Sequence, residues 1–458
     1  MCFRTVFYSG SVTMLADAED TMIRITEGDQ NLTEQRAQWS EALPHNKTVL
    51  RDTDLYFHQV LSTPCLDEIV RAKGAEITTA SGRTLLDFHG NSVHQIGFGH
   101  PDVIRAIETQ MRSLPYCTRR YTNRVAVELA ERLVSLAPGS LRGNARVLLT
   151  PSGSAAVGLA LKLAFAVTGR YKTIAFNDAF HGATIDAASL SGQDLFHRGM
   201  GPMLPGVCHV PPLTEPGSIE QIEKLLDARD IAAVIAEPIR ATCVRLASTS
   251  VWERVRNACD RTGTLLVLDE IPTGLGRSGK LWASEHTGIT PDIMVIGKGL
   301  GGGMIPQAAV IGRAEFNETG TTPVRELALG HYTHEKSPIG CAAAIATLDT
   351  IENESLVERS HELGSWWLDA YRAPLLRIPG VNDVRQIGLM LAVELNDPEH
   401  ADRAMYESLR SGLSFKVGAA QCLVLFPPLN VESTQLERAS ETLLAAIKRA
   451  HPSTQVRS

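Results

Sequence analysis

Two groups of charged residues follow short apolar segments, where chemistry is expected in an α/β protein. Residues 265–268 (LLVL) lead to Asp269 and Glu270, and residues 293–296 (IMVI) lead to Lys298 and a run of glycines. Both segments are typical of buried strands, and ligands of open α/β sheets bind at the carboxyl ends of the strands. A lysine between an apolar strand and a glycine-rich turn is poorly solvated, which favours the neutral amine that forms Schiff bases. An aspartate at the end of the neighbouring strand is the partner that a protonated pyridine nitrogen needs.

A third stretch could hold a phosphate group. Ser152, Gly153 and Ser154 precede two alanines, so free backbone N–H groups and a hydroxyl lie at the start of a predicted helix. Phe180 follows another strand-like segment, TIAFN, and could stack on a planar ring. Each feature alone has an ordinary alternative: a helix cap, a solvated lysine or a core aromatic. Their combination favours a catalytic site.

The hydrophobic pattern divides the chain into a large α/β region and a smaller C-terminal region. From about residue 147, apolar strand-like segments alternate with helical segments, which predicts α/β architecture. Beyond about residue 338, a long helical segment leads into further strands and helices, and we expect the N-terminal segment to complete this smaller domain. The predicted divisions are a variable N-terminal extension (1–45), the N-terminal part of the small domain (46–95), the large domain (96–337) and the C-terminal small domain (338–458).

Composition argues against several classes of protein. The 458 residues carry a net charge of −7 with no block of Lys or Arg, so no nucleic-acid partner is expected. No apolar run approaches the length of a membrane span, and the first residues lack a clear signal-peptide pattern. The eight cysteines include no CxxC pair, which predicts free thiols in the cytoplasm. His89, His94 and His100 match no standard metal-ligand spacing, so no metal site is predicted.

Several motifs occur in an order that is specific to one family. They are SGSAAVGLALKLA (152–164), FHG (180–182), EP (237–238), LDEIPTGLGRSG (268–279), IGKGLGGG (296–303), THEKSPIGCAAA (333–344) and PPL (427–429). From about residue 55 to 450 the chain resembles the class III, fold-type I enzymes that use pyridoxal 5'-phosphate and are related to ω-aminotransferases. The resemblance implies a large domain with a mostly parallel seven-stranded sheet flanked by helices. It also implies a homodimer with shared active sites, with a tetramer as the alternative assembly.

The resemblance assigns roles to individual residues. Lys298 is similar to the lysine that binds the cofactor covalently and moves protons, and Asp269 to the partner of the pyridine nitrogen. Glu237 would lie near the ring, and Thr333 matches a threonine that reaches the cofactor phosphate of the neighbouring subunit. The other implied cofactor contacts are Gly153 and Ser154 at the phosphate, Phe180 and Ile271 on the two faces of the ring, and His181.

One position departs from the transaminating members of the family. Most of them carry an arginine three residues before the proline pair, where it binds the substrate carboxylate. Val424 occupies that position here, and a valine cannot bind a carboxylate. Four cations near the predicted site could instead bind a dianionic phosphonate or phosphate on an amine substrate: Arg119, Arg120, Arg240 and Lys336.

These features resemble a subgroup of ammonia-lyases in bacterial phosphonate breakdown, which are relatives of phosphoethanolamine phospho-lyases. The segments DFHGNSVHQIGFGHP, TRRYTN and HYTHEKSP carry this resemblance. It implies elimination of the hydroxyl of (R)-1-hydroxy-2-aminoethylphosphonate to give phosphonoacetaldehyde and ammonia. The alternatives are an ω-amine or 2-aminoethylphosphonate:pyruvate aminotransferase, a phospho-lyase of the phosphoethanolamine type, and a non-catalytic binding protein on the same fold.

Overall fold

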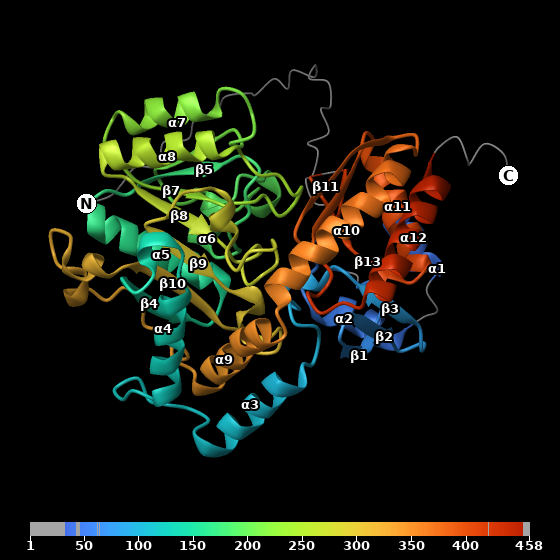
Figure 1. Cartoon of the computed structure of the whole chain (residues 1–458), viewed down its shortest axis with the longest axis horizontal. Coiled ribbons are helices and arrows are strands. Elements are labelled where there is room, and N and C mark those ends of the chain that lie inside the picture. The colour runs from blue at the N-terminus through green and yellow to red at the C-terminus, as the bar shows by residue number, and fades with distance from the viewer. Residues whose placement is uncertain (1–32, 43–45, 62, 64, 420, 452–458) are drawn as a thin grey trace, which may run out of the picture.

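The computed structural model describes residues 33–42, 46–61, 63, 65–419 and 421–451. A large central sheet with helices on both faces occupies one side of the molecule, and two smaller sheets with their helices occupy the other (Figure 1). None of the described helices combines the length and the apolarity that crossing a membrane requires.

The central sheet has seven strands, and only one of them runs against the others. Its inner strands are buried on both faces, as expected of strands that are continuous apolar runs. The strand order is β4 (Ala145–Thr150), β10 (Ala308–Arg313), β9 (Ile293–Ile296), β8 (Leu265–Asp269), β7 (Ile231–Ala236), β5 (Lys172–Phe176) and β6 (Val207–Val210). The predicted mostly parallel seven-stranded sheet is confirmed.

The antiparallel strand is β10, which lies between β4 and β9. Its connection from β9 consists of residues 297–307, which is too short for the crossover that a parallel neighbour requires. This connection carries the predicted catalytic lysine in the 3₁₀ turn η5 (Lys298–Gly301). The turn is therefore held between two adjacent strands of the sheet.

Helices cover both faces of the central sheet. On β8, Val267 belongs to the apolar cluster of α5, while Leu266 and Leu268 belong to the cluster of α7 and α8. Successive side chains of a strand point to opposite faces, so both faces need a helical cover. The helices of this part are α3 (Pro101–Ser113), α4 (Arg124–Leu136), α5 (Gly153–Thr168), α6 (Ile185–Leu190), α7 (Ser218–Leu226), α8 (Thr249–Thr262) and α9 (Pro338–Asn353).

The ends of α5 follow from its sequence. Ser152 caps the first turn by accepting a hydrogen bond from the N–H of Ala155 at 3.2 Å. Gly169 ends the helix with a left-handed φ of 68°, and its N–H bonds to the carbonyl of Phe165. Since β4 leads directly into α5, the helix N-terminus lies at the carboxyl end of that strand.

Both ends of the chain build the first of the two smaller sheets. Leu413 on β13 is paired with Leu86 on β3, in parallel, which joins the C-terminal and N-terminal segments as expected. The first sheet consists of β1 (Ile69–Lys73), β2 (Glu76–Thr79), β3 (Thr84–Asp87) and β13 (Leu413–Ser414). The second consists of β11 (Val381–Ile387), β12 (Met390–Leu395), β15 (Cys422–Leu425) and β14 (Lys416–Gly418).

The predicted N-terminal extension contains a helix that packs on this part of the molecule. Trp39 of α1 (Glu34–Ala42) is buried, and its ring lies 5.8 Å from that of Tyr406 on α11 (Pro398–Arg410). Residues 34–42 therefore contribute to the core, while residues 1–32 and 43–45 lie outside the described part of the chain. The domain boundaries themselves stay predictions. The remaining helices are α2 (Lys47–Leu55), α10 (Leu356–Leu376) and α12 (Ser433–Ala450).

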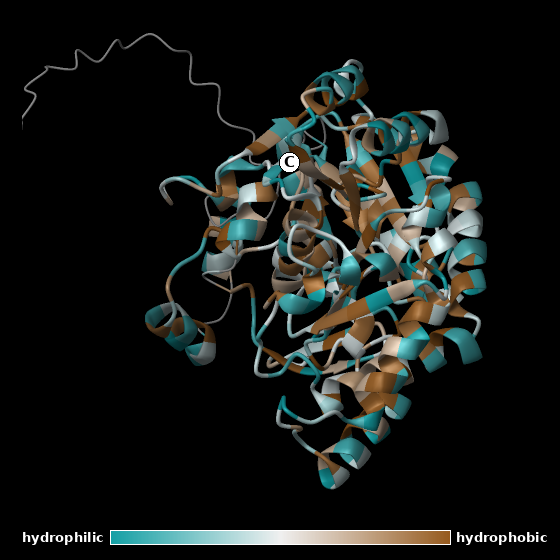
Figure 2. Ribbon diagram, turned by 90° about the vertical axis from the view of Figure 1, so that its left-hand side faces the viewer, coloured by the Kyte–Doolittle hydropathy of each residue, from teal (hydrophilic) through white to brown (hydrophobic). Residues whose placement is uncertain are grey.

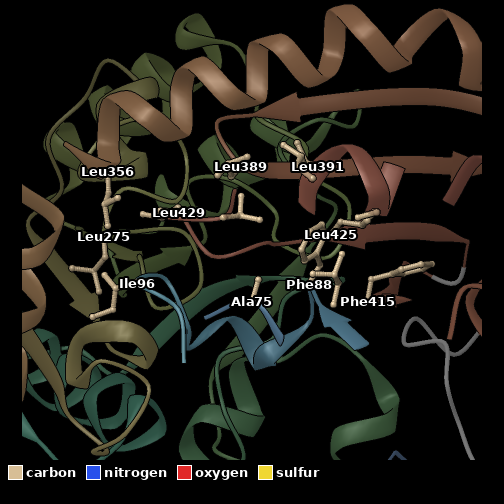
Figure 3. Packing of buried hydrophobic residues seen from close by; sticks show 14 of the residues in the cluster. Ala75, Phe88, Ile96, Leu275, Leu356, Leu389, Leu391, Phe415, Leu425 and Leu429 are labelled. Atoms are coloured by element: carbon tan, nitrogen blue, oxygen red, sulfur yellow. The ribbon is translucent and has the colours of Figure 1, made fainter. Parts of the chain in front are cut away.

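An apolar cluster joins the central sheet to the smaller sheets. Figure 3 shows Leu275, from the loop after β8, near Ile96 and below Leu356, while Leu429 lies near Leu389. Hydrophobic residues are concentrated on the inner strands, and the outer helices carry most of the hydrophilic residues (Figure 2). Burial of apolar surface from several segments stabilises their relative positions.

Candidate active site

The strands bring the predicted site residues to one edge of the central sheet. β8 ends at Asp269, β9 ends two residues before Lys298, and β7 ends directly before Glu237. The loop after β5 carries Phe180. Because these strands are parallel, their carboxyl ends meet at the same edge, which is where ligands of such sheets bind.

This edge faces the C-terminal sheet. Nε of Arg385 on β11 donates to the carbonyl of Cys243 at 3.0 Å, in the loop that follows β7. The N–H of Leu389, between β11 and β12, donates to the carbonyl of Arg277 at 3.1 Å, in the loop that follows β8. The candidate site therefore lies between the central sheet and the C-terminal sheet.

Lys298 lies in a strained turn. Its φ of 48° is in the left-handed region, which residues with a side chain rarely adopt. Lys298 is half-buried, and the next residue, Gly299, packs so closely that a Cβ there would collide with the amide of Gln95. The glycine after the lysine thus allows close packing behind the turn.

Two hydrogen bonds fix the carboxylate of Asp269. Oδ1 accepts from the N–H of Ile271 at 2.9 Å, and Oδ2 lies 2.8 Å from Nδ1 of His181. Both side chains of this hydrogen-bonded pair are almost completely buried. A carboxylate only accepts hydrogen bonds, so Nδ1 donates, and Nε2 of His181 has no partner among the described residues. The pair holds a negative charge at a fixed place on the sheet edge.

The N-terminus of α5 forms a cradle for an anion. The N–H groups of Gly153 and Ser154 lie in the first turn, where a helix offers no acceptor. A Cβ on Gly153 would lie 2.8 Å from Cδ1 of Ile271, so the backbone approaches the edge only because this residue is glycine. Oγ of Ser154 accepts from the N–H of Ala183 at 3.1 Å and keeps its own hydrogen for a ligand. Such a helix start suits a phosphate group.

Two apolar side chains border the same edge. Phe180 is half-buried, and its ring centroid lies 4.5 Å from that of Phe196, which restrains its orientation. Ile271 is 8 % exposed and packs against Gly153 and Gly297. An aromatic ring and an aliphatic side chain on one edge suit the two faces of a planar ligand.

Glu237 belongs to a buried ion-pair network. Nη1 of Arg240 donates to Oε1 of Glu237, and Oε2 accepts from the N–H of Ala241 at 3.0 Å. Nε of Arg240 donates to Oδ2 of Asp178 at 2.7 Å, and Nη2 donates to the carbonyl of Asp178 and to Oγ1 of Thr242. Burial alone lowers the pKa of Arg240, but the carboxylates of Glu237 and Asp178 raise it above its ordinary value.

This network argues against the predicted substrate contact of Arg240. Four of its N–H bonds already have acceptors in the protein. One guanidinium also faces two carboxylates, Glu237 and Asp178, so the group carries an excess negative charge. A second anion from a substrate would be repelled. Arg240 therefore holds the carboxylate of Glu237 in place.

The other three predicted cations lie on two loops that are fastened together. Nε of Arg119 donates to Oε1 of Glu335 at 2.8 Å, and Nη2 donates to the carbonyl of Gly330 at 3.1 Å. Arg120 and Lys336 are exposed, and neither side chain has a hydrogen bond or ion pair to the residues that the structure describes. Arg119 is therefore engaged within the protein, whereas the other two cations are available.

Thr333 lies on the second of these loops. Tyr116 donates from its hydroxyl to the carbonyl of Thr333 at 3.4 Å, and Nδ2 of Asn123 donates to the carbonyl of Lys336 at 3.2 Å. Thr333 itself is exposed. The predicted phosphate-binding threonine therefore lies on the same pair of joined loops as Arg119, Arg120 and Lys336, whereas Arg240 lies in the loop that follows β7.

Residues 58–447 match the family Aminotransferase class-III. The chain belongs to this family. It is 39% identical to the (R)-1-hydroxy-2-aminoethylphosphonate ammonia-lyase of Vibrio splendidus, over 92% of this chain and 95% of that protein. It is 34% identical to an acetylornithine aminotransferase of Methanopyrus kandleri, over 83% of this chain and 94% of that protein. A solved amine transaminase from an uncultivated Pseudomonas species, with bound pyridoxal phosphate, has a TM-score of 0.80 and 29% identity, over 87% of this chain and 99% of that chain.

Membership of the class III family implies pyridoxal 5'-phosphate as the cofactor, and the residues present fit it. The helix start at Gly153 and Ser154 suits the phosphate. The carboxylate of Asp269, which is held by Nδ1 of His181, suits a protonated ring nitrogen. Nε2 of His181 is buried and has no hydrogen-bond partner among the described residues. Lys298 is the predicted source of the amine. The roles of the individual cofactor contacts stay predictions.

Two charged residues that the structure buries were assigned no individual role from the sequence, although Glu270 was singled out there as part of the acidic pair after the strand. Glu270 is 1 % exposed and accepts hydrogen bonds from the N–H groups of Ala283 and Ser284, and burial raises its pKa to about 6. Arg277 is fully buried, bonds to the carbonyl of Pro427, and burial lowers its pKa to about 9. Charged residues are mostly exposed, so only their place inside the LDEIPTGLGRSG motif could have indicated their burial.

The three histidines considered for a metal site have separate partners. Nε2 of His94 bonds to the carbonyl of Asp87 at 2.9 Å, and Nε2 of His100 lies 3.0 Å from Oε1 of Glu354. Nδ1 of His89 accepts from the N–H of Asn91 at 3.1 Å. Within the described ranges, no group of three or more His, Cys, Asp or Glu residues is placed to hold a metal ion.

Proposed function

We propose that this class III enzyme is an ammonia-lyase that converts (R)-1-hydroxy-2-aminoethylphosphonate into phosphonoacetaldehyde and ammonia, as part of phosphonate breakdown. The observation that carries the proposal is the environment of Val424. This residue is 2 % exposed and packs with Ile239 and Phe426 in an apolar cluster. A keto-acid acceptor has no cation to bind at this position, and a lyase needs no acceptor. The Vibrio splendidus relative, whose name states this activity, supports the same reading.

The residues of the site have separate tasks in this reaction. When bound, pyridoxal phosphate supplies an electron sink for the carbon that bears the amine. Lys298 removes a proton from C2 of the substrate, and Asp269, held by His181, keeps the ring nitrogen protonated. The hydroxyl on C1 leaves as water, and one water molecule returns when ammonia is released. Substrate atoms therefore balance against aldehyde and ammonia, and no amino acceptor is consumed.

The proposed enzyme is a homodimer with shared active sites in the cytoplasm. A groove of about 550 Å³ on the surface is lined mostly by apolar side chains of α4, β4 and β10, such as Val127, Val147 and Val310, and Lys336 also lines it. An apolar groove beside the loop of Thr333 supports contact with a second copy there. The seven described cysteines are free thiols, which supports a reducing compartment.

The deciding experiment measures ammonia release from racemic 1-hydroxy-2-aminoethylphosphonate without a keto acid. We expect ammonia and aldehyde in equal amounts, up to half of the racemate, and no reaction with Lys298→Ala. No ammonia, but alanine after addition of pyruvate, would make the protein a transaminase. Inorganic phosphate from phosphoethanolamine would make it a phospho-lyase. A purified protein that holds no pyridoxal phosphate would point to a non-catalytic binding protein.

A further inference from the structure

We propose that Arg120 and Lys336 bind the substrate phosphonate in the active site of the partner subunit, so that each site takes its anion clamp from the other chain. This inference rests on the proposed function, because it concerns the same substrate. It assigns different tasks to the four predicted cations. Arg120 and Lys336 bind the substrate, Arg119 holds their two loops together, and Arg240 forms an ion pair with Glu237.

Arg120 and Lys336 lie on two loops that are held together by hydrogen bonds and a ring contact. Arg119 ties the loop of residues 116–123 to that of residues 330–337 through the carboxylate of Glu335 and the carbonyl of Gly330. The rings of Tyr116 and His334 add an edge contact, with centroids 5.5 Å apart. Fastened loops keep two cations at a defined separation, which a dianionic phosphonate with three acceptor oxygens requires.

No acid of these loops is left to neutralise the two cations. Glu335 is already paired with Arg119. Arg120 and Lys336 have no ion-pair partner among the residues that the structure describes, and both are exposed. The surface therefore carries two uncompensated positive charges beside the groove that we assign to the partner.

The two loops lie away from the C-terminal sheet that borders the site of their own chain (Figure 1). That site faces the C-terminal sheet, as the contact of Arg385 with Cys243 shows. The connection between α3 and α4, which holds Arg120, lies at the lower left of Figure 1, on the opposite side from that sheet. Within the described part of the chain, no hydrogen bond or ion pair joins either loop to the loops that follow β7 and β8. Lys336 instead lines the groove at the surface.

The first test changes both cations in the intact holoenzyme. Arg120→Ala/Lys336→Ala should raise KM for the phosphonate about tenfold or more, with pyridoxal phosphate content unchanged. Arg124→Ala removes a neighbouring exposed cation that pairs with Glu128, and it should leave KM unchanged. An unchanged KM in the double variant overturns the clamp.

The second test decides which subunit supplies the clamp, with two differently tagged chains purified as a heterodimer. A Lys298→Ala chain paired with the double-variant chain should regain about half of the wild-type ammonia release, because one site then combines Lys298 with an intact partner clamp. A wild-type chain paired with a chain that carries all three substitutions should be nearly inactive at low substrate. The reverse pattern, or a fully active monomer, overturns the inference. If the wild-type enzyme releases no ammonia, the proposed function is wrong. The same heterodimers then test which subunit supplies Arg120 and Lys336, with the activity that the wild-type enzyme does show as the readout.

Discussion

Nδ1 of His181 lies 2.8 Å from Oδ2 of Asp269, and both side chains are almost completely buried. His181 comes from the loop after β5 and Asp269 is the last residue of β8, so the contact connects the segment that carries Phe180 with the end of β8. A buried carboxylate is costly unless hydrogen bonds satisfy it, and this histidine supplies one of the two bonds that Asp269 accepts from described residues. His181 therefore fixes the position of the Asp269 carboxylate, which is the predicted partner of the cofactor nitrogen.

Replacement of His181 should weaken cofactor binding without unfolding the protein. We expect His181→Phe to lower the affinity for pyridoxal phosphate by about 1–3 kcal/mol, because Asp269 loses its buried donor. His181→Gln can donate from its amide and should recover most of the loss. Equilibrium dialysis of the cofactor measures both. His400→Phe, which removes a buried histidine bonded to the carbonyl of Ile447, is the control and should leave the affinity unchanged. Equal losses in the phenylalanine variants would contradict the role.

Lys298→Ala should abolish turnover and leave the cofactor non-covalently bound. Loss of the group that moves the C2 proton costs at least about a hundredfold in rate, while the cradle at Gly153 and Ser154 is untouched. Ammonia release and dialysis of the cofactor measure the two effects separately. Lys280→Ala is the matched control, since Lys280 is exposed and its Nζ donates to the carbonyl of Glu285 at 3.1 Å. Retained turnover in Lys298→Ala would refute the mechanism.

Arg240 and Glu237 should be energetically coupled. Arg240→Met leaves a buried carboxylate without its cation, which costs about 3–5 kcal/mol of unfolding free energy. The additional change Glu237→Gln removes that charge, so the double variant should be more stable than Arg240→Met alone. Urea denaturation of the four proteins in the cycle measures the coupling. Arg254→Met, which breaks an exposed pair with Glu223, should cost less than about 1 kcal/mol. Additive effects of the two buried changes would rule out the coupling.

Glu270 should make the protein less stable as the pH rises from 4.5 to 6. Burial raises its folded-state pKa from the ordinary 4.5 to about 6. Between these values the folded protein holds a proton that the unfolded chain has lost, so the free energy of unfolding falls as the pH rises. The full cost above pH 6 is about 2 kcal/mol. Glu270→Gln does not titrate, so the difference in stability between wild type and variant should change over this window.

Denaturant midpoints at several pH values measure the effect of Glu270, because all other groups cancel in the difference. A constant difference for Glu270→Gln would mean that its carboxyl is not raised in pKa.

Val424→Arg should not create a transaminase. The new cation would replace a valine that packs with Ile239 and Phe426, and a buried charge without a partner costs several kcal/mol. We expect a lower denaturation midpoint and no amino transfer to pyruvate, whereas Val424→Leu should cost less than about 1.5 kcal/mol. Alanine formation by Val424→Arg would show that this position opens into the substrate site, and would weaken the argument for a lyase.

The strand-end chemistry could be predicted from the sequence because it depends on local pattern. Apolar runs that end in Asp269 and before Lys298 become parallel strands, and parallel strands place their carboxyl ends on one edge. The small residues after Ser152 likewise predict the helix start that forms the anion cradle. These relationships follow from residues close together in the chain.

The partners of the charged side chains depended on tertiary structure. From the sequence, Arg240 was predicted to be a cation available to the substrate. In the structure its Nε donates to Asp178, from the loop after a different strand, and its Nη1 donates to Glu237. His181 had a role only by resemblance until folding placed Nδ1 beside Asp269. Electrostatic partners and burial are long-range properties, whereas strand and helix patterns are local. The sequence by itself therefore determined where the chemistry lies, and only the fold decided which charges remain available to a substrate.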